Sequence, residues 1–294
     1  MISVITATNR PGGVDINYTS LRRQTHKDFE WVFCDTLYDK RHKALLEYTK
    51  NDSRVKHYPQ SKKDPKAKTW LAHAENEAIS HAKGELIVML QDYIHIEPTA
   101  LEKFWYQYNQ DKKRMITGVG HQYGKPGKED ITNINGMITL FKKPFEGMPE
   151  VIVWQDPRIR QDQGSFYKCN PNDWEVNYAC APRKMFYDVG GFDEEYDFVG
   201  FAFDNCSVAQ RAFMLGYDPY IDQTNISYSV RHDDFFSNKA KNNDDFIKIA
   251  TFHHQRMREI AEGKRNLKYN FLDKTVEKSY KEAKSESEND TSTE

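Results

Sequence analysis

Polar side chains of ligand-binding types follow three apolar runs of this sequence directly. They are Thr8 and Asn9 after the run 2–7, Asp35 after the run 29–34, and Gln91, Asp92 and Tyr93 after the run 86–90. Carboxylate, amide and hydroxyl groups hydrogen-bond polar ligands, and a carboxylate also binds hard cations such as Mg²⁺. Open α/β sheets bind their ligands at the carboxyl ends of the strands. We therefore expect a binding site where these runs end.

The elements that must position these groups alternate between strands and helices. Each apolar run is short and continuous, as in strands that are buried on both faces. Residues 69–83 repeat apolar side chains at helical spacing and end at Gly84, which suits a helix C-terminus. A further helix is expected from Pro98 to Asn109, and residues 115–119 continue the sheet. This alternation predicts an α/β fold, a Rossmann-like, mostly parallel sheet with helices on both faces.

Residues 120–175 break this pattern, because many glycines and prolines interrupt short apolar pieces. Such a region favours hairpins and loops, and we assign it to acceptor recognition or to a lid. Regular elements return beyond it. They are expected as a strand at 176–180, a helix at 204–215 and a last strand at 217–221.

The domain organisation follows from these patterns. Residues 1–235 form one domain, and residues 236–272 form a helical extension, since their apolar side chains keep helical spacing up to Gly263. Residues 273–294 are charged and almost free of apolar side chains, and we expect a disordered tail there.

Composition excludes several classes of protein. A formal net charge of -2 and a pI of about 6.6 give no overall basic field for nucleic acid. Neither a long apolar run nor a basic leader is present, so the sequence predicts no transmembrane segment and no signal peptide. The four cysteines lack CxxC spacing, which indicates reduced thiols. We expect a soluble, cytoplasmic protein, with peripheral membrane association and the oligomeric state left open.

Four segments together resemble the inverting family 2 glycosyltransferases of the GT-A fold. They are ISVITATNRPGG, LRRQTHKDFEWVFCD, KTWLAHAENEAISHAKGELIVMLQDYIHIEP and VGGFDEEYDFVGFAFDNCSVAQRAFMLGY, within residues 2–235. Each segment alone is weak, and their common order and spacing carry the resemblance. It implies inverting transfer of a sugar from a nucleotide diphosphate donor, which we expect to be a UDP-sugar, to an acceptor hydroxyl.

On the donor side, the resemblance implies that Asp92 lies at the diphosphate. The family's acidic DxD motif binds Mn²⁺ or Mg²⁺, which meets the charge of the leaving group, but the matching segment Gln91-Asp92-Tyr93 keeps only one carboxylate. Asp92 therefore either binds a divalent metal or hydrogen-bonds the ribose or sugar in a site with little metal dependence. His232 resembles a late histidine that completes the metal site in some members. The structural alternative for Asp92 is a cap on the helix near Pro98.

Other residues are matched to the nucleotide through the same resemblance. Asp35 occupies the position of a carboxylate that accepts a hydrogen bond from a uracil-type imide, with Thr36 in place of a second acid. Thr8 and Asn9 would contact the same nucleotide, unless they only form a turn. Lys68 is the candidate for a basic group near the diphosphate.

On the acceptor side, the resemblance implies that Asp204 is the general base. Inversion needs a base that takes the proton of the acceptor hydroxyl, and a helix N-terminus would help to keep Asp204 ionised. Its acidic partner is missing, because Phe203 precedes it, and a simple helix cap is the alternative. Trp174 is either a wall on the acceptor side or a buried aromatic. Four more acids are alternatives for the base, although we interpret them as turn and solvent residues, namely Asp193, Glu194, Glu195 and Asp197.

Two other functions remain open at this point. A nucleotidyltransferase would need a glycine-rich, basic loop after the first strand, and residues 8–13 supply one arginine and two glycines. An idle nucleotide-sugar-binding protein would account for the incomplete acidic motifs. The acceptor hydroxyl is not readable from the sequence and could belong to a glycan, a lipid-linked sugar, a protein or a modified nucleobase.

Overall fold

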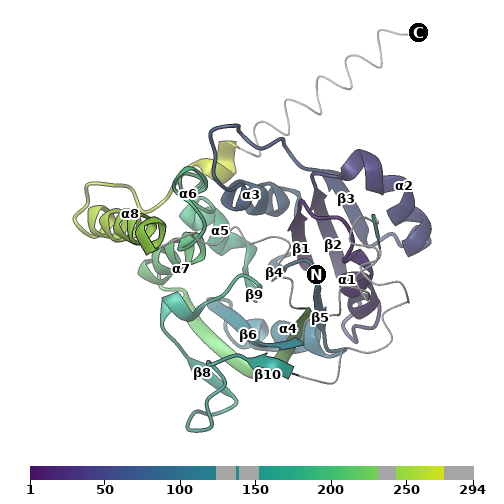
Figure 1. Ribbon diagram of the computed structural model, residues 1–294. Helices are drawn as coiled ribbons and strands as arrows, with labels where there is room; N and C mark the ends of the chain where they lie inside the picture. The colour runs from purple at the N-terminus through teal and green to yellow at the C-terminus, as the bar shows by residue number, and fades with distance from the viewer. Residues whose placement is uncertain (124–136, 139–151, 231–242, 275–294) are drawn as a thin grey trace.

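The computed structural model describes residues 1–123, 137–138, 152–230 and 243–274. Within these residues a ten-stranded sheet forms the centre of the molecule (Figure 1), in the order β3-β2-β1-β4-β9-β6-β10-β5, with β7 paired to β6 and β8 paired to β10. The strands are β1 Ile2–Thr8, β2 Phe29–Asp35, β3 Val55–Pro59, β4 Leu86–Leu90, β5 Ile94–Ile96, β6 Arg114–Tyr123, β7 Ile152–Gln155, β8 Phe166–Lys168, β9 Tyr178–Pro182 and β10 Asp218–Val230.

Most of the long strands run in one direction, which confirms the predicted mostly parallel sheet. β1 pairs in parallel with both β2 and β4, β2 with β3, and β6 with β10. β9 runs antiparallel between β4 and β6, and it keeps these two strands in the common direction. β1, β2 and β4 therefore end at the same edge, as the ligand-site prediction requires.

Helices cover both faces of the sheet, as predicted. They are α1 Val14–Leu21, α2 Tyr38–Thr49, α3 Leu71–His81, α4 Ala100–Gln110, α5 Arg183–Val189, α6 Tyr196–Val199, α7 Asp204–Met214 and α8 Asn243–Ala261, with a short 3-10 turn at Pro171–Asp173. Successive side chains of a strand point to opposite faces. Ile87 and Met89 of β4 thus join the cluster under α3, α5 and α7, whereas Leu86 and Val88 join the cluster under α1, α2 and α4.

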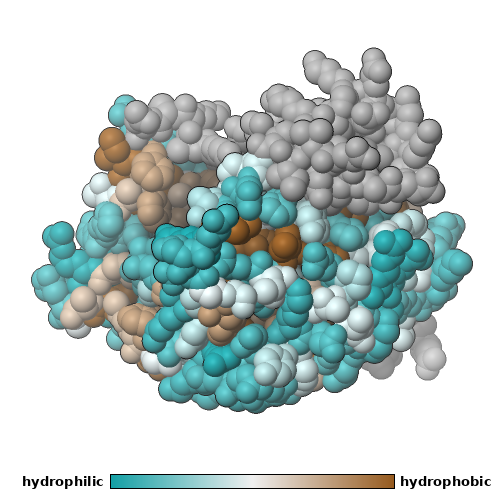
Figure 2. All heavy atoms as spheres, turned by 90° about the horizontal axis from the view of Figure 1, so that it is seen from below, coloured by the Kyte–Doolittle hydropathy of each residue, from teal (hydrophilic) through white to brown (hydrophobic). Residues whose placement is uncertain are grey.

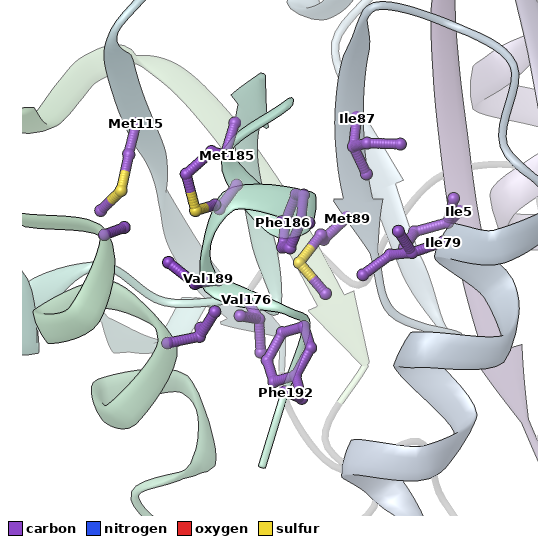
Figure 3. Packing of buried hydrophobic residues seen from close by; sticks show 14 of the residues in the cluster. Ile5, Ile79, Ile87, Met89, Met115, Val176, Met185, Phe186, Val189 and Phe192 are labelled. Carbon is purple, nitrogen blue, oxygen red and sulfur yellow. The ribbon is translucent and has the colours of Figure 1, made fainter. Parts of the chain in front are cut away.

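Figure 3 shows the part of the core that lies under α3, α5 and α7. Ile5 and Ile79 bring β1 and α3 together, and Met89 lies near Phe186 of α5. Gly84 lets α3 lead directly into β4, since a Cβ there would lie 2.5 Å from the backbone nitrogen of Ser3. The start of β4 is therefore fixed by close packing against the start of β1.

The C-terminal segment packs on this core. His253 of α8 hydrogen-bonds Tyr196 of α6 at 2.8 Å, and the backbone of Tyr269 donates to Val189. Leu272 is 0% exposed and belongs to the cluster under α3, α5 and α7. Residues 243–272 thus complete the core, and the tail predicted for 273–294 lies almost wholly outside the described residues.

Of the predicted loop region 120–175, the described parts form the end of β6, β7, β8 and the short turn before β9. The face seen in Figure 2 is mostly hydrophilic with small apolar areas, in agreement with a mean hydropathy of -0.84. None of the helices in the described ranges has both the length and the apolar composition needed to cross a bilayer.

Candidate active site

The ends of β1 and β4 meet at the predicted edge. The hydroxyl of Thr8 donates to Oδ2 of Asp92 at 2.6 Å, although 84 positions separate the two in the chain. The structure thereby brings two predicted site residues into direct contact. Asp92 is 7% exposed, so its carboxylate lies at the base of the edge.

Arg10 joins this pair, and the sequence analysis did not single it out. Its Nη2 is 3.1 Å from Oδ1 of Asp92, and its backbone N–H donates to the hydroxyl of Thr8 at 3.1 Å. Asp92 thus has one oxygen bonded to a hydroxyl and the other paired with a guanidinium. A helix cap is not the role that these contacts give it.

Tyr93 and Gly13 fix the shape of this corner. Tyr93 has a left-handed backbone, with φ of 64°, and is 1% exposed. Its hydroxyl donates to the carbonyl of Pro11 at 2.8 Å, and burial raises its pKa. A Cβ on Gly13 would lie 1.9 Å from the Tyr93 ring, so glycine alone fits there. A buried, protonated phenol that hydrogen-bonds the loop is a structural group, and strained backbone of this kind often lies at functional sites.

The other residues that were predicted to bind the nucleotide-sugar donor lie at different places around this edge. Gln91 is half-buried and Asn9 is exposed at the edge. The backbone carbonyl of Gln91 accepts from Nδ2 of Asn17 at 3.0 Å. Lys68 lies in the loop before α3, where its Nζ donates to the carbonyl of Val199 at 2.9 Å. Lys68 therefore ties this loop to the end of α6.

Asp35 is enclosed rather than open to a ligand. It is 0% exposed, and its Oδ1 accepts from the backbone of Leu37 at 2.8 Å. Its Oδ2 lies 3.3 Å from Nε of Arg41 and 3.2 Å from Nε2 of His57. Burial lowers the pKa of His57, and burial also lowers the pKa of Arg41. With these partners around it, this carboxylate does not present a free oxygen to a uracil imide.

The segment that leads to Asp204 is anchored to α3. The first backbone N–H groups of a helix have no acceptor within the helix, and in α3 the carboxylate of Asp197 accepts their hydrogen bonds. Its carboxylate accepts from Leu71 at 2.8 Å and from His73 at 3.0 Å. Asn76 exchanges two hydrogen bonds with the backbone of Phe192, at 2.8 and 3.0 Å. The interpretation of Asp197 as a solvent residue is wrong, because it is 1% exposed and caps this helix.

Asp204 is the first residue of α7, and α7 covers the same face of the sheet as α3. Ala202 and Phe203, directly before it, have φ of 155° and 64°, a strained turn for residues other than glycine. Asp204 is 8% exposed, and its Oδ2 has no hydrogen-bond partner among the described residues. Burial raises the pKa of Asp204 to about 6, because desolvation outweighs the backbone hydrogen bonds at the helix N-terminus. At neutral pH this carboxylate is mostly ionised and suited to accept a proton.

Glu75 is a second site residue that the sequence analysis missed. It is a buried residue of α3, and burial raises its pKa to about 8, with further contributions from the charges of Asp204 and Asp92. Both Asp92 and Asp204 are therefore near enough to Glu75 for their charges to act on its carboxyl. The signal in the sequence is its place in the apolar stripe of α3, between Leu71 and Ile79.

Trp174 does not line the acceptor side. Its ring is 0% exposed and packs with Phe186 in the core, which is the alternative that the sequence left open. The next residue, Glu175, is half-buried, and its charge contributes to the raised pKa of Asp204. Glu175 is therefore the residue of this segment that is near the candidate base.

The described residues do not fit a metal site of the expected kind. No group of three or more histidine, cysteine, aspartate or glutamate side chains among them is arranged to bind an ion. Hard cations prefer several oxygen ligands, whereas Asp92 is paired with Arg10, and Tyr93 turns its hydroxyl to Pro11. His232, the other predicted ligand, lies outside the described residues.

Comparisons with known proteins agree with this geometry. The sequence model described as glycosyl transferase family 2 matches residues 3–170. No curated protein sequence matches the chain significantly.

Three solved structures share the fold, each at 12% identity. Staphylococcus aureus TarS 1-349 in complex with UDP covers 84% of this chain and 62% of its own length, with a TM-score of 0.54. GalNAc-T7 with UDP, GalNAc and Mn²⁺ covers 85% of this chain and 47% of its own, with a TM-score of 0.60. A further S. aureus TarS structure covers 87% and 39%, with a TM-score of 0.53. The chain thus spans less than two thirds of each of these proteins.

These neighbours are GT-A glycosyltransferases, so the predicted fold is confirmed. Because the family model matches more than half of the 294 residues, the chain belongs to glycosyl transferase family 2.

Proposed function

We propose that this enzyme transfers a sugar from a UDP-sugar to an acceptor hydroxyl with inversion at the anomeric carbon. The observation that carries the proposal is Asp204, a mostly buried carboxylate at the head of α7 with an unbonded oxygen. The charges of Asp204 and Asp92 both act on Glu75. UDP is the nucleotide present in the TarS and GalNAc-T7 structures, which supports UDP as the donor nucleotide.

In the proposed reaction, Asp204 accepts the proton of the acceptor hydroxyl. The hydroxyl oxygen forms a bond to the anomeric carbon as the bond from that carbon to the diphosphate breaks. The electron pair of the broken bond stays with UDP, so the site must meet added negative charge on the phosphates. The edge formed by Thr8, Arg10 and Asp92 is where we place the donor.

Burial tunes Asp204 for this role. A pKa of about 6 leaves the carboxylate ionised at neutral pH yet more basic than an exposed aspartate. Glu175, the last residue of the region 120–175, contributes to the raised pKa of Asp204, which supports our assignment of this region to acceptor recognition. The acceptor itself is a hydroxyl compound whose class we leave open among glycans, lipid-linked sugars, proteins and modified nucleobases.

The test is the stereochemistry of donor hydrolysis. A panel of α-linked UDP-, GDP- and CDP-sugars is incubated with the protein, and ¹H NMR follows the anomer that is formed first. We expect UDP release from one member of the panel, with the β-anomer as the initial product. Initial formation of the α-anomer would contradict inversion and the base role, and release of nucleotide only from GDP- or CDP-sugars would contradict UDP as the donor nucleotide.

A further inference from the structure

The side chain of Arg10 lies beside the one carboxylate that remains of the acidic motif. Its Nη2 is 3.1 Å from Oδ1 of Asp92, and its guanidinium carbon is 5.2 Å from the centre of the Tyr93 ring. Arg10 is 20% exposed, and Asp92 is 7% exposed. A guanidinium is thus held at the ligand edge, with part of its surface open to a bound molecule.

The backbone of Arg10 is fixed as firmly as its side chain. Its N–H donates to Thr8, and the same hydroxyl donates to Asp92. Its carbonyl accepts a hydrogen bond from Arg41, which is in turn paired with the buried Asp35. Two strand ends therefore hold this residue in place before any ligand binds, and such preorganisation reduces the cost of binding.

We propose that Arg10, oriented by Asp92, is the cation that meets the diphosphate of the donor, and that donor binding does not require a divalent metal. The inference rests on the proposed function, because it takes a nucleoside diphosphate as the ligand. An arginine fork bonds phosphate oxygens in pairs and keeps its charge throughout the working pH range. Asp92 acts here as a positioning residue, which accounts for a motif with one acid. A metal would need several oxygen ligands, whereas a guanidinium needs only one carboxylate to orient it.

The experiment is calorimetric titration of the full chain with uridine, UMP and UDP, first in EDTA and then with Mn²⁺. The variant is Arg10→Gln, and Arg22→Gln is the matched control, since Arg22 is an exposed arginine at the end of α1. We expect wild-type UDP affinity to be equal in EDTA and Mn²⁺. Arg10→Gln should weaken UDP binding roughly 10- to 100-fold and leave uridine binding unchanged, as expected for lost hydrogen bonds to a charged group. Arg22→Gln should match the wild type.

Three further variants separate the outcomes. If Arg10→Gln unfolds, Arg10→Lys keeps the charge without the fork and should weaken UDP binding by a smaller factor, again with uridine unaffected. UDP binding that requires Mn²⁺, survives Arg10→Gln and is lost in Asp92→Asn or His232→Ala would overturn the inference and leave the proposed function standing. Absence of binding by UDP in both EDTA and Mn²⁺ would overturn the UDP-sugar proposal and the inference together.

Discussion

Replacing Glu75 by glutamine tests whether a neutral carboxyl is buried at the centre of the site. Burial raises the pKa of Glu75 from 4.5 to about 8, so the folded protein keeps a proton that the unfolded chain loses above pH 4.5. Between these pH values the unfolded state binds fewer protons, and the free energy of unfolding therefore falls as pH rises. The full difference corresponds to roughly 5 kcal/mol, an upper limit for a buried group beside two other acids.

Glutamine imitates the protonated carboxyl and cannot ionise. We expect wild type and Glu75→Gln to have similar free energies of unfolding at pH 4.5, and the variant to be more stable by about 2 kcal/mol or more at pH 8.5. Urea denaturation at pH values between 4.5 and 8.5 measures both curves. Other buried acids also titrate, and the difference between the two proteins isolates Glu75.

The matched control is Glu47→Gln, which removes the same charge from an exposed position of α2. Its free energy of unfolding should follow the wild type at every pH. Parallel curves for wild type and Glu75→Gln would refute the reasoning, because they would show that Glu75 is ionised in the folded protein like an exposed glutamate.

Three other predictions follow from the same geometry. Asp204 must be ionised to act as a base, so kcat/KM should rise with pH through a pKa of about 6. Ionised Glu75 would repel the diphosphate, so kcat/KM should fall again above pH 8 in the wild type but not in Glu75→Gln. Gly13→Ala should weaken UDP binding by displacing the Tyr93 ring, as measured by calorimetry, while Gly164→Ala, whose Cβ would have no neighbour closer than 4.0 Å, should not. If the C-terminal segment completes the core, Leu272→Ala should lower the free energy of unfolding by about 2–5 kcal/mol, measured by urea denaturation. An unchanged midpoint of the urea unfolding curve would contradict this.

The sequence was sufficient for the elements with a clear apolar pattern. β1, β2 and β4 are buried on both faces, so each is a continuous apolar run with polar residues at its end. The pattern failed where a strand is irregular or short. β10 extends to Val230, well beyond the predicted end at Ile221, because its pairing with β6 shifts register between Asp222 and Ile226. β5 has only three residues, and α2 has too few apolar side chains to be recognised.

The candidate site was predictable only in part, for a physical reason. Thr8 and Asp92 end buried strands, and sequence order alone places such residues at the ligand edge. The fold buries Glu75 and partly buries Arg10, and in a sequence a charged residue is first interpreted as a solvent-exposed one. Trp174 shows that an aromatic residue near a predicted site can equally belong to the core, since its ring is buried against Phe186.

The most direct test of the proposed mechanism compares UDP release from the preferred UDP-sugar by the wild type and by Asp204→Asn, with UDP affinity measured on the same samples. Asparagine keeps the shape of the side chain and removes the base. We predict that UDP release falls by roughly 100-fold or more, the usual contribution of a general base, while the affinity for UDP stays within a factor of two. Near-normal UDP release by Asp204→Asn would contradict the assignment of Asp204 as the base.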